Sequence, residues 1–161
     1  MAIIPKNISI LNVKGLIIIL LFCISANLNA QIAIVVHKDN PLDEISIDDL
    51  RKIYKGEMNF FPNSKLKILT CESHTIKDAF YKKIYNWTVL KFKKHWMKLI
   101  FSGENLRAPK TFKNEFELIN FMKTNIDAIV YMKYTDVDPD LKIIQIDGKS
   151  PNHPDYFLKF E

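Results

Sequence analysis

The stretch from Lys65 to Phe80, KLKILTCESHTIKDAF, decides the fold class. Lys67–Cys71 is short and rich in residues that favour strands, and the turn-forming residues Pro62–Ser64 precede it. The polar residues Glu72–Thr75 follow it. We therefore expect a buried strand that passes through one turn directly into a helix.

The helix of this stretch is predicted to begin at Thr75. Asp78 follows three positions later, which is the spacing of a capping box. The apolar residues that follow at helical intervals are Ile76, Ala79, Phe80 and Ile84. The first turn of a helix has unpartnered backbone N–H groups and a positive dipole end, so Ser73, His74 and Thr75 are the candidate ligands for a small oxyanion. A simple N-cap explains the same pattern, and both interpretations stay open.

Three other segments are predicted to be strands. Ile32–His37 is an almost continuous apolar run, which is typical of a strand buried on both faces. Ala128–Tyr131 and Leu141–Ile146 are the last two, and Asp147-Gly148 ends the second of them.

Three further helices are predicted from caps and apolar spacing. Ser46 with Asp49 and Asn114 with Glu117 repeat the capping-box spacing, and Gly56 suits the end of the first helix. Another helix is expected within Asn86–Ser102. The apolar residues expected to face the core are Phe92, Trp96, Leu99 and Ile100 in that helix, and Phe116, Ile119 and Met122 in the last one.

Alternating strands and capped helices favour a three-layer α/β domain. We expect one domain over residues 31–148, followed by a loosely packed C-terminal extension at residues 149–161. A length of 161 residues with 48% hydrophobic and 25% charged residues agrees with one globular core.

Residues 1–30 are predicted to be a secretory signal peptide. Lys6 and Lys14 precede the apolar run Leu16–Ile24, which is too short to span a bilayer, and a polar segment leads to Ala30. Cleavage after Ala30 would release the chain into the periplasm or the medium. An uncleaved anchor is the alternative, because Leu28 is large for the position three residues before the cut.

Charge and residue types exclude several classes of function. Of 23 basic residues, two lie in the leader, so 21 remain against 18 acidic ones, which is too balanced for a nucleic-acid-binding protein. Removal of the leader leaves Cys71 as the single cysteine, so no internal disulfide is expected. The four histidines show no metal-ligand spacing, and no nucleophile, base and acid form a recognisable set. We expect no enzyme activity, no metal and no cofactor.

Residues 32–148 resemble the phosphate-type substrate-binding proteins of ABC transporters, and more closely their small, single-lobe secreted members. The motif Ile53-Tyr54-Lys55-Gly56 is similar to an isoleucine-phenylalanine-x-glycine motif of that family, and Phe60 or Phe61 stands where the family has tryptophan. Further similarities are at Trp96, at Ile100-Phe101-Ser102-Gly103, at Pro109 and at Asn125–Tyr131. The resemblance implies a periplasmic-binding-protein-like lobe.

The same resemblance implies phosphate or another small oxyanion as ligand, with Ser73, His74 and Thr75 in the place of a serine-glycine-threonine turn. The family's arginine before that turn falls at about Leu69, and no arginine lies between Arg51 and Arg107. Lys67 and Lys77 are the nearby residues that could supply positive charge. Two functions therefore remain: an oxyanion binder that serves an ABC-type transporter, and an accessory or interaction module that retains the fold without the ligand, with a membrane transporter or receptor as partner.

Overall fold

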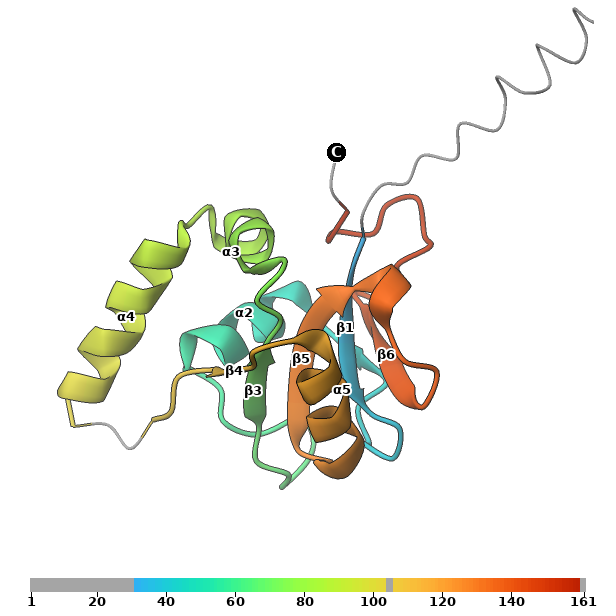
Figure 1. The fold of residues 1–161 in the computed structure, drawn as a ribbon, viewed down its shortest axis with the longest axis horizontal. Coiled ribbons are helices and arrows are strands. Elements are labelled where there is room, and N and C mark those ends of the chain that lie inside the picture. Colours follow the sequence, from blue (N-terminus) through green and yellow to red (C-terminus); the bar gives the residue numbers. More distant parts are fainter. Residues whose placement is uncertain (1–30, 104–105, 160–161) are drawn as a thin grey trace, which may run out of the picture.

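The computed structural model describes residues 31–103 and 106–159, so the predicted leader lies outside the described residues. A six-stranded mixed sheet, in the order β2-β6-β1-β5-β3-β4, forms the centre of the fold. Helices cover both of its faces (Figure 1). The three-layer α/β architecture predicted from the sequence is confirmed.

The elements follow one another as β1, β2, α2, β3, α3, α4, β4, α5, β5, η1 and β6. The strands are β1 (Ile32–His37), β2 (Glu44–Ile45), β3 (Leu69–Glu72), β4 (Lys110–Thr111), β5 (Ala128–Lys133) and β6 (Leu141–Ile146). The helices are α2 (Ile47–Lys55), α3 (Lys77–Tyr85), α4 (Val89–Phe101), α5 (Glu115–Thr124) and the short 3-10 helix η1 (Tyr134–Asp136). None of the helices in the described part of the chain has both the length and the apolar character that crossing a membrane requires.

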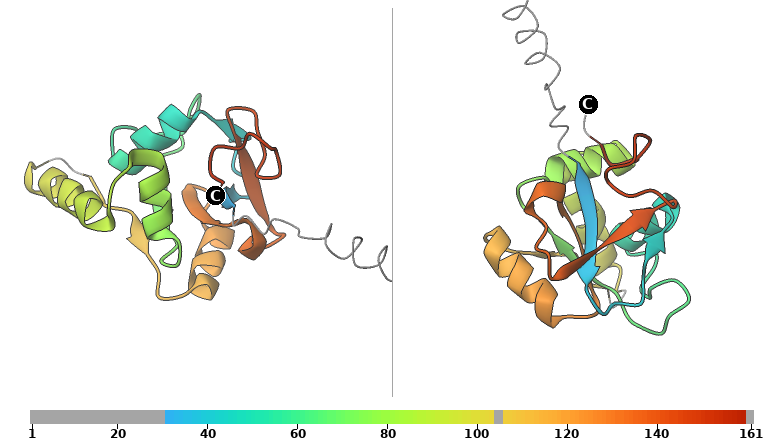
Figure 2. Two further views of the ribbon diagram at one scale, coloured as in Figure 1. Left: turned by 90° about the horizontal axis from the view of Figure 1, so that it is seen from above. Right: turned by 90° about the vertical axis from the view of Figure 1, so that its right-hand side faces the viewer.

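The central strand β1 is buried on both faces, as predicted. Ile32, Ile34 and Val36 join the apolar cluster that α2, α3 and α4 cover, whereas Ala33 and Val35 join the cluster beneath α5. Successive side chains of a strand point to opposite faces, so a run that is apolar at every position needs a layer on each side. Figure 2 shows the helices in these two layers.

Strand pairing determines which loops meet. β1 pairs antiparallel with β5 and with β6, whereas β3 pairs parallel with both β4 and β5. In the β3–β4 pair, Cys71 lies opposite Lys110 and Glu72 lies opposite Thr111. Because these strands are parallel, the turn that follows β3 lies beside the segment that leads from β4 into α5.

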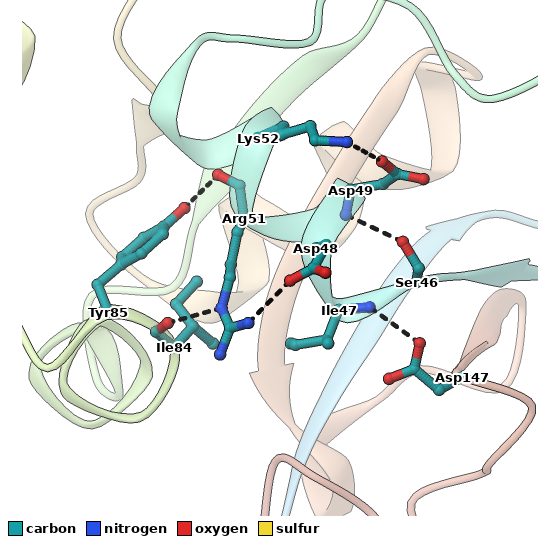
Figure 3. Close-up of polar contacts among 9 residues, drawn as sticks. All are labelled: Ser46, Ile47, Asp48, Asp49, Arg51, Lys52, Ile84, Tyr85 and Asp147. Atoms are coloured by element: carbon teal, nitrogen blue, oxygen red, sulfur yellow. Dashed lines mark hydrogen bonds and ion pairs between the residues drawn. The ribbon is translucent and has the colours of Figure 1, made fainter.

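Polar contacts at the start and along the middle of α2 hold it in place (Figure 3). Ser46 Oγ accepts a hydrogen bond from the backbone N–H of Asp49 at 3.0 Å, which confirms the predicted cap. Arg51 Nε donates to the Ile84 carbonyl at 2.9 Å and thereby joins α2 to α3. Asp147 Oδ1 accepts from the Ile47 N–H at 3.2 Å, which joins α2 to the end of β6. Gly56 ends the helix with φ of 80°, as predicted.

The faces of two helices differ in part from the prediction. In α4, Phe92 and Trp96 are buried and Leu99 packs against the core as expected, but Ile100 is 48% exposed. In α5, the expectation that Phe116 faces the core is wrong: its side chain is 74% exposed. Met122 is buried as predicted, and Leu118, four residues earlier on the same helical face, is the buried residue that the prediction missed.

The segment after Ser150 packs more closely than predicted. Tyr156 and Leu158 are buried, and the Leu158 carbonyl accepts a hydrogen bond from the Ile32 N–H at 3.0 Å. Pro151 and Pro154 suggested a loose tail, but the burial of two apolar side chains in this short stretch holds it against the core.

Candidate functional site

The candidate turn Ser73–Thr75 lies at the carboxyl end of β3 and before α3, as the sequence predicts. Its role as a helix cap is wrong, however. α3 begins at Lys77, and its N-cap residue Ile76 makes no side-chain capping hydrogen bond. Thr75 lies one residue before the N-cap position, so its hydroxyl does not satisfy a backbone N–H of this helix and donates to another partner.

That partner is Glu115, the first residue of α5. Ser73 Oγ and Thr75 Oγ1 both donate hydrogen bonds to Glu115 Oε1, the second at 3.0 Å, and the two hydroxyl oxygens lie 2.9 Å apart. A hydrogen bond to a charged acceptor contributes roughly 1.5–3 kcal/mol, more than a neutral cap bond does. The two hydroxyls therefore hold a carboxylate that belongs to the chain itself.

The position of Glu115 explains why its charge is tolerated there. The Asn114 side chain caps α5 by accepting from the Glu117 N–H at 2.9 Å, so Glu115 stands at the positive end of this helix dipole. Its second oxygen, Oε2, is buried and has no hydrogen-bond partner among the described residues. The carboxylate thus occupies the place in which an oxyanion was expected.

His74 does not belong to this hydroxyl cluster. Its side chain is exposed, and no hydrogen bond in the described part of the chain involves it. The structure therefore brings together two of the three predicted ligand residues, Ser73 and Thr75, and leaves His74 at the surface beside them.

A second carboxylate, that of Glu72, lies directly before the turn and is almost fully buried. Tyr81 Oη and Lys77 Nζ contact its two oxygens, and Thr111 Oγ1 donates to Oε2 at 3.0 Å. A buried charge needs such partners, because removing one would leave it unpaired at a cost of several kcal/mol. Burial raises the pKa of the Tyr81 hydroxyl well above its usual value, with nearby Tyr131 and Glu72 adding to the effect, so Tyr81 stays a proton donor to Glu72.

The cations considered for the site are not free to bind an anion there. Lys77 pairs with Glu72, and Lys67 precedes β3 at the end opposite to the turn. Leu69 begins β3, so four residue steps of about 3.3 Å separate it from Ser73. An arginine at position 69 would lie too far along the strand to reach the two hydroxyls.

Cys71 is the buried small residue that its sequence position predicts. Burial raises the pKa of its thiol to about 12, which keeps it protonated at neutral pH. Within residues 31–103 and 106–159, no cluster of three or more His, Cys, Asp or Glu side chains is arranged to hold a metal ion.

Sequence reasoning missed Glu72, Thr111 and Glu115. Glu115 is 42 residues from Ser73, and its own surroundings in the sequence identify it only as a first-turn acid of a capped helix. The parallel pairing of β3 and β4 is what brings it to the turn. That pairing rests on two residue pairs and leaves no periodic pattern in a two-residue strand.

No protein-family model and no curated protein sequence matches this chain. Among solved structures, an ABC-type phosphate transport receptor from Vibrio cholerae matches with a TM-score of 0.57 and 18% identity, over 76% of this chain and 48% of that one. A phosphate ABC-transporter substrate-binding protein with bound phosphate from Clostridium perfringens matches with a TM-score of 0.59 and 17% identity, over 76% and 47%. PstS from Borrelia burgdorferi matches with a TM-score of 0.56 and 18% identity, over 81% and 54%.

The chain has the fold of phosphate-type substrate-binding proteins. It spans about half the length of these solved chains, as one lobe of a two-lobed binding protein would. This confirms the fold that the sequence resemblance implied. The phosphate-binding-protein fold is therefore present here together with an internal carboxylate at the Ser73–Thr75 turn.

Proposed function

We propose that this protein is an exported, non-enzymatic, solute-binding-like protein that acts as an interaction module beside a membrane transporter or receptor, and not as a phosphate carrier. The fold supports the solute-binding part of this proposal, and the named neighbours are binding proteins and not enzymes. The observation that carries the rest is that Glu115 Oε1 accepts hydrogen bonds from both Ser73 and Thr75.

Electrostatic repulsion is the reason why we expect no phosphate to bind at the Ser73–Thr75 turn. A phosphate ion at this turn would have to displace the Glu115 carboxylate or lie against it, with Glu72 buried one residue before Ser73. Like charges at such short separations repel, and Lys77 already neutralises Glu72. The hydroxyl hydrogen bonds that an anion would need are thus already donated to Glu115.

Isothermal titration of the mature protein with phosphate, sulfate and acetate tests the proposal. We expect no binding heat at millimolar concentrations of any of the three. A dissociation constant for phosphate below about 0.1 mM would overturn it, since it corresponds to more than ~5 kcal/mol of binding free energy from a site that should repel the ion.

An oxyanion-binding protein that serves an ABC-type transporter is the second candidate function. Its support is the exposure of Thr75 and His74 beside the buried Ser73, which leaves one side of the hydroxyl cluster open to solvent. On this alternative, phosphate displaces the Glu115 carboxylate from the two hydroxyls, so the wild type binds phosphate weakly and Glu115→Ala binds it more tightly. Glu117→Ala, two residues further along α5 and exposed, is the matched control.

Export is part of the proposal and rests on the pattern of residues 1–30. N-terminal sequencing of exported material should give Gln31 or a residue next to it. Recovery of only full-length chain from the membrane fraction would show that the protein is anchored and is not a free periplasmic module.

A further inference from the structure

The outward face of α4 combines exposed apolar side chains with lysines. Leu90, Met97 and Phe101 are 62%, 56% and 83% exposed. They stand seven and four residues apart, so they form one stripe along the helix. The opposite side of α4 is the one that packs on the protein, through Phe92 and Trp96.

Lysines flank this stripe on both sides. Lys93 precedes Met97 by four residues, and Lys94 follows Leu90 by four, so each is a surface neighbour of the stripe. Lys98 extends the second flank by one further turn. All three are exposed, and the ion pairs of the described residues do not involve them.

The positive charge of the chain is concentrated in this helix. α4 contains four lysines and no acidic residue. Two of the 23 basic residues precede Gln31, so seventeen basic residues remain outside α4 against all 18 acidic ones. The rest of residues 31–161 is therefore close to neutral, and an attraction to negative charge would be directed to α4.

The place of α4 in the fold makes this face accessible. In Figure 1 and in the left view of Figure 2, α4 lies at one end of the molecule, far from β1 and β6.

We propose that the outward face of α4 binds a membrane surface rich in anionic phospholipids. An apolar stripe flanked by lysines is the pattern of helices that lie in a membrane interface, where apolar side chains enter the acyl boundary and lysines meet headgroup phosphates. The charge of the face selects a negative surface, and the projecting phenylalanine, leucine and methionine select one that accepts apolar groups. This assignment is independent of what the Ser73–Thr75 turn binds.

Co-sedimentation of the mature protein with lipid vesicles tests the assignment. We expect the wild-type chain to sediment with phosphatidylcholine vesicles that contain about one third phosphatidylglycerol, and to remain in solution with pure phosphatidylcholine. Salt at about 0.5 M should weaken the binding because it screens the lysines. Replacing Lys93, Lys94 and Lys98 with Gln should lower the partition coefficient by roughly 100-fold, at about fivefold per lysine.

Matched variants distinguish binding by this face from binding through net charge or through exposed apolar residues elsewhere. Replacing three exposed lysines elsewhere with Gln removes the same net charge and should lower the partition coefficient much less. These lysines are Lys38, Lys65 and Lys82. Gln at Leu90, Met97 and Phe101 should reduce binding at least tenfold, whereas Gln at the exposed residues Phe60, Phe116 and Ile126 should not. Circular dichroism and thermal unfolding confirm that each variant is folded.

Two results would overturn the assignment. Wild-type protein that is folded but stays in the supernatant with anionic vesicles would exclude the membrane and leave an acidic protein surface as the partner of α4. Equal losses in the α4 and the scattered lysine variants would show that net charge, and not this face, drives sedimentation.

Discussion

Trp96 packs directly over Gly56. The indole Nε1 donates to the Tyr54 carbonyl at 3.2 Å, and a Cβ atom added at Gly56 would lie 2.8 Å from Cη2 of the same ring. Gly56 also has φ of 80°, where side chains are disfavoured. The end of α2 and the middle of α4 therefore fit together only with glycine at this position.

Gly56→Ala should lower the free energy of unfolding by about 2–4 kcal/mol. About 1–2 kcal/mol comes from the left-handed backbone conformation, and the clash with Trp96 adds the remainder. Urea unfolding measures the loss. Gly148→Ala is the control, because Gly148 has φ of 71° but no atom within 4 Å of an added Cβ, so it should show the backbone cost alone. Equal losses at both positions would mean that the contact with Trp96 is not tight in solution.

The Cys71 thiol should resist thiol reagents in the folded protein. Burial raises its pKa from 9.0 to about 12, so the reactive thiolate is about a thousandfold scarcer in the native state at pH 8. Ellman's reagent should therefore label the mature protein slowly, and urea should accelerate labelling as the chain unfolds. Rapid labelling of folded protein would contradict the burial of this strand end.

Local sequence patterns predicted much of the fold because the physics that determines these features is local. Ser46 and Asn114 cap their helices in the predicted way, since a cap involves only residues three positions apart. The double burial of Ile32–Val36 follows from its composition alone. Thr75 failed as a cap because α3 begins at Lys77, which leaves Thr75 one residue before the N-cap position, where its hydroxyl donates to Glu115.

Contacts between distant segments limited the prediction of the site. The turn Ser73–Thr75 was placed correctly at a strand end, but its chemistry depends on Glu115, which approaches only through the β3–β4 pairing. Phe116 was misplaced for a related reason: with Glu115 turned toward the site, the next residue faces solvent. No spacing within either segment encodes this relationship.

Tyr156→Phe should stabilise the protein slightly, with an effect that grows at alkaline pH. The Tyr156 hydroxyl is buried without a hydrogen-bond partner in the described residues, a cost of about 1–3 kcal/mol that phenylalanine avoids. Burial also raises the pKa of Tyr156 above the usual value of 10.0.

The sign of the pH effect follows from that shift. The folded state holds the Tyr156 proton more tightly than the unfolded state does. The stability that this proton contributes is therefore fully present below pH ~10, and it is lost as pH rises above that value, by about 1.4 kcal/mol per pH unit. Burial acts in the same direction on Tyr54 and Tyr81. Wild-type stability, measured by urea unfolding at several pH values, should therefore fall steeply above pH ~10, and less steeply in Tyr156→Phe. Identical alkaline slopes would show that Tyr156 ionises as readily in the folded state.

Ser73 and Glu115 should be energetically coupled. Ser73→Ala removes a buried donor to the Glu115 carboxylate and should lower the free energy of unfolding by about 1.5–3 kcal/mol. In a Glu115→Ala background the same change should cost less, with a coupling energy of about 0.5–3 kcal/mol, because the hydroxyl has already lost its acceptor. Ser46→Ala removes a cap that does not touch Glu115, so its loss of about 1 kcal/mol should be the same in both backgrounds. If Ser73→Ala were equally costly with and without Glu115, the hydroxyl would serve the fold or a ligand by another contact, and the internal carboxylate would no longer be a reason to expect that phosphate does not bind.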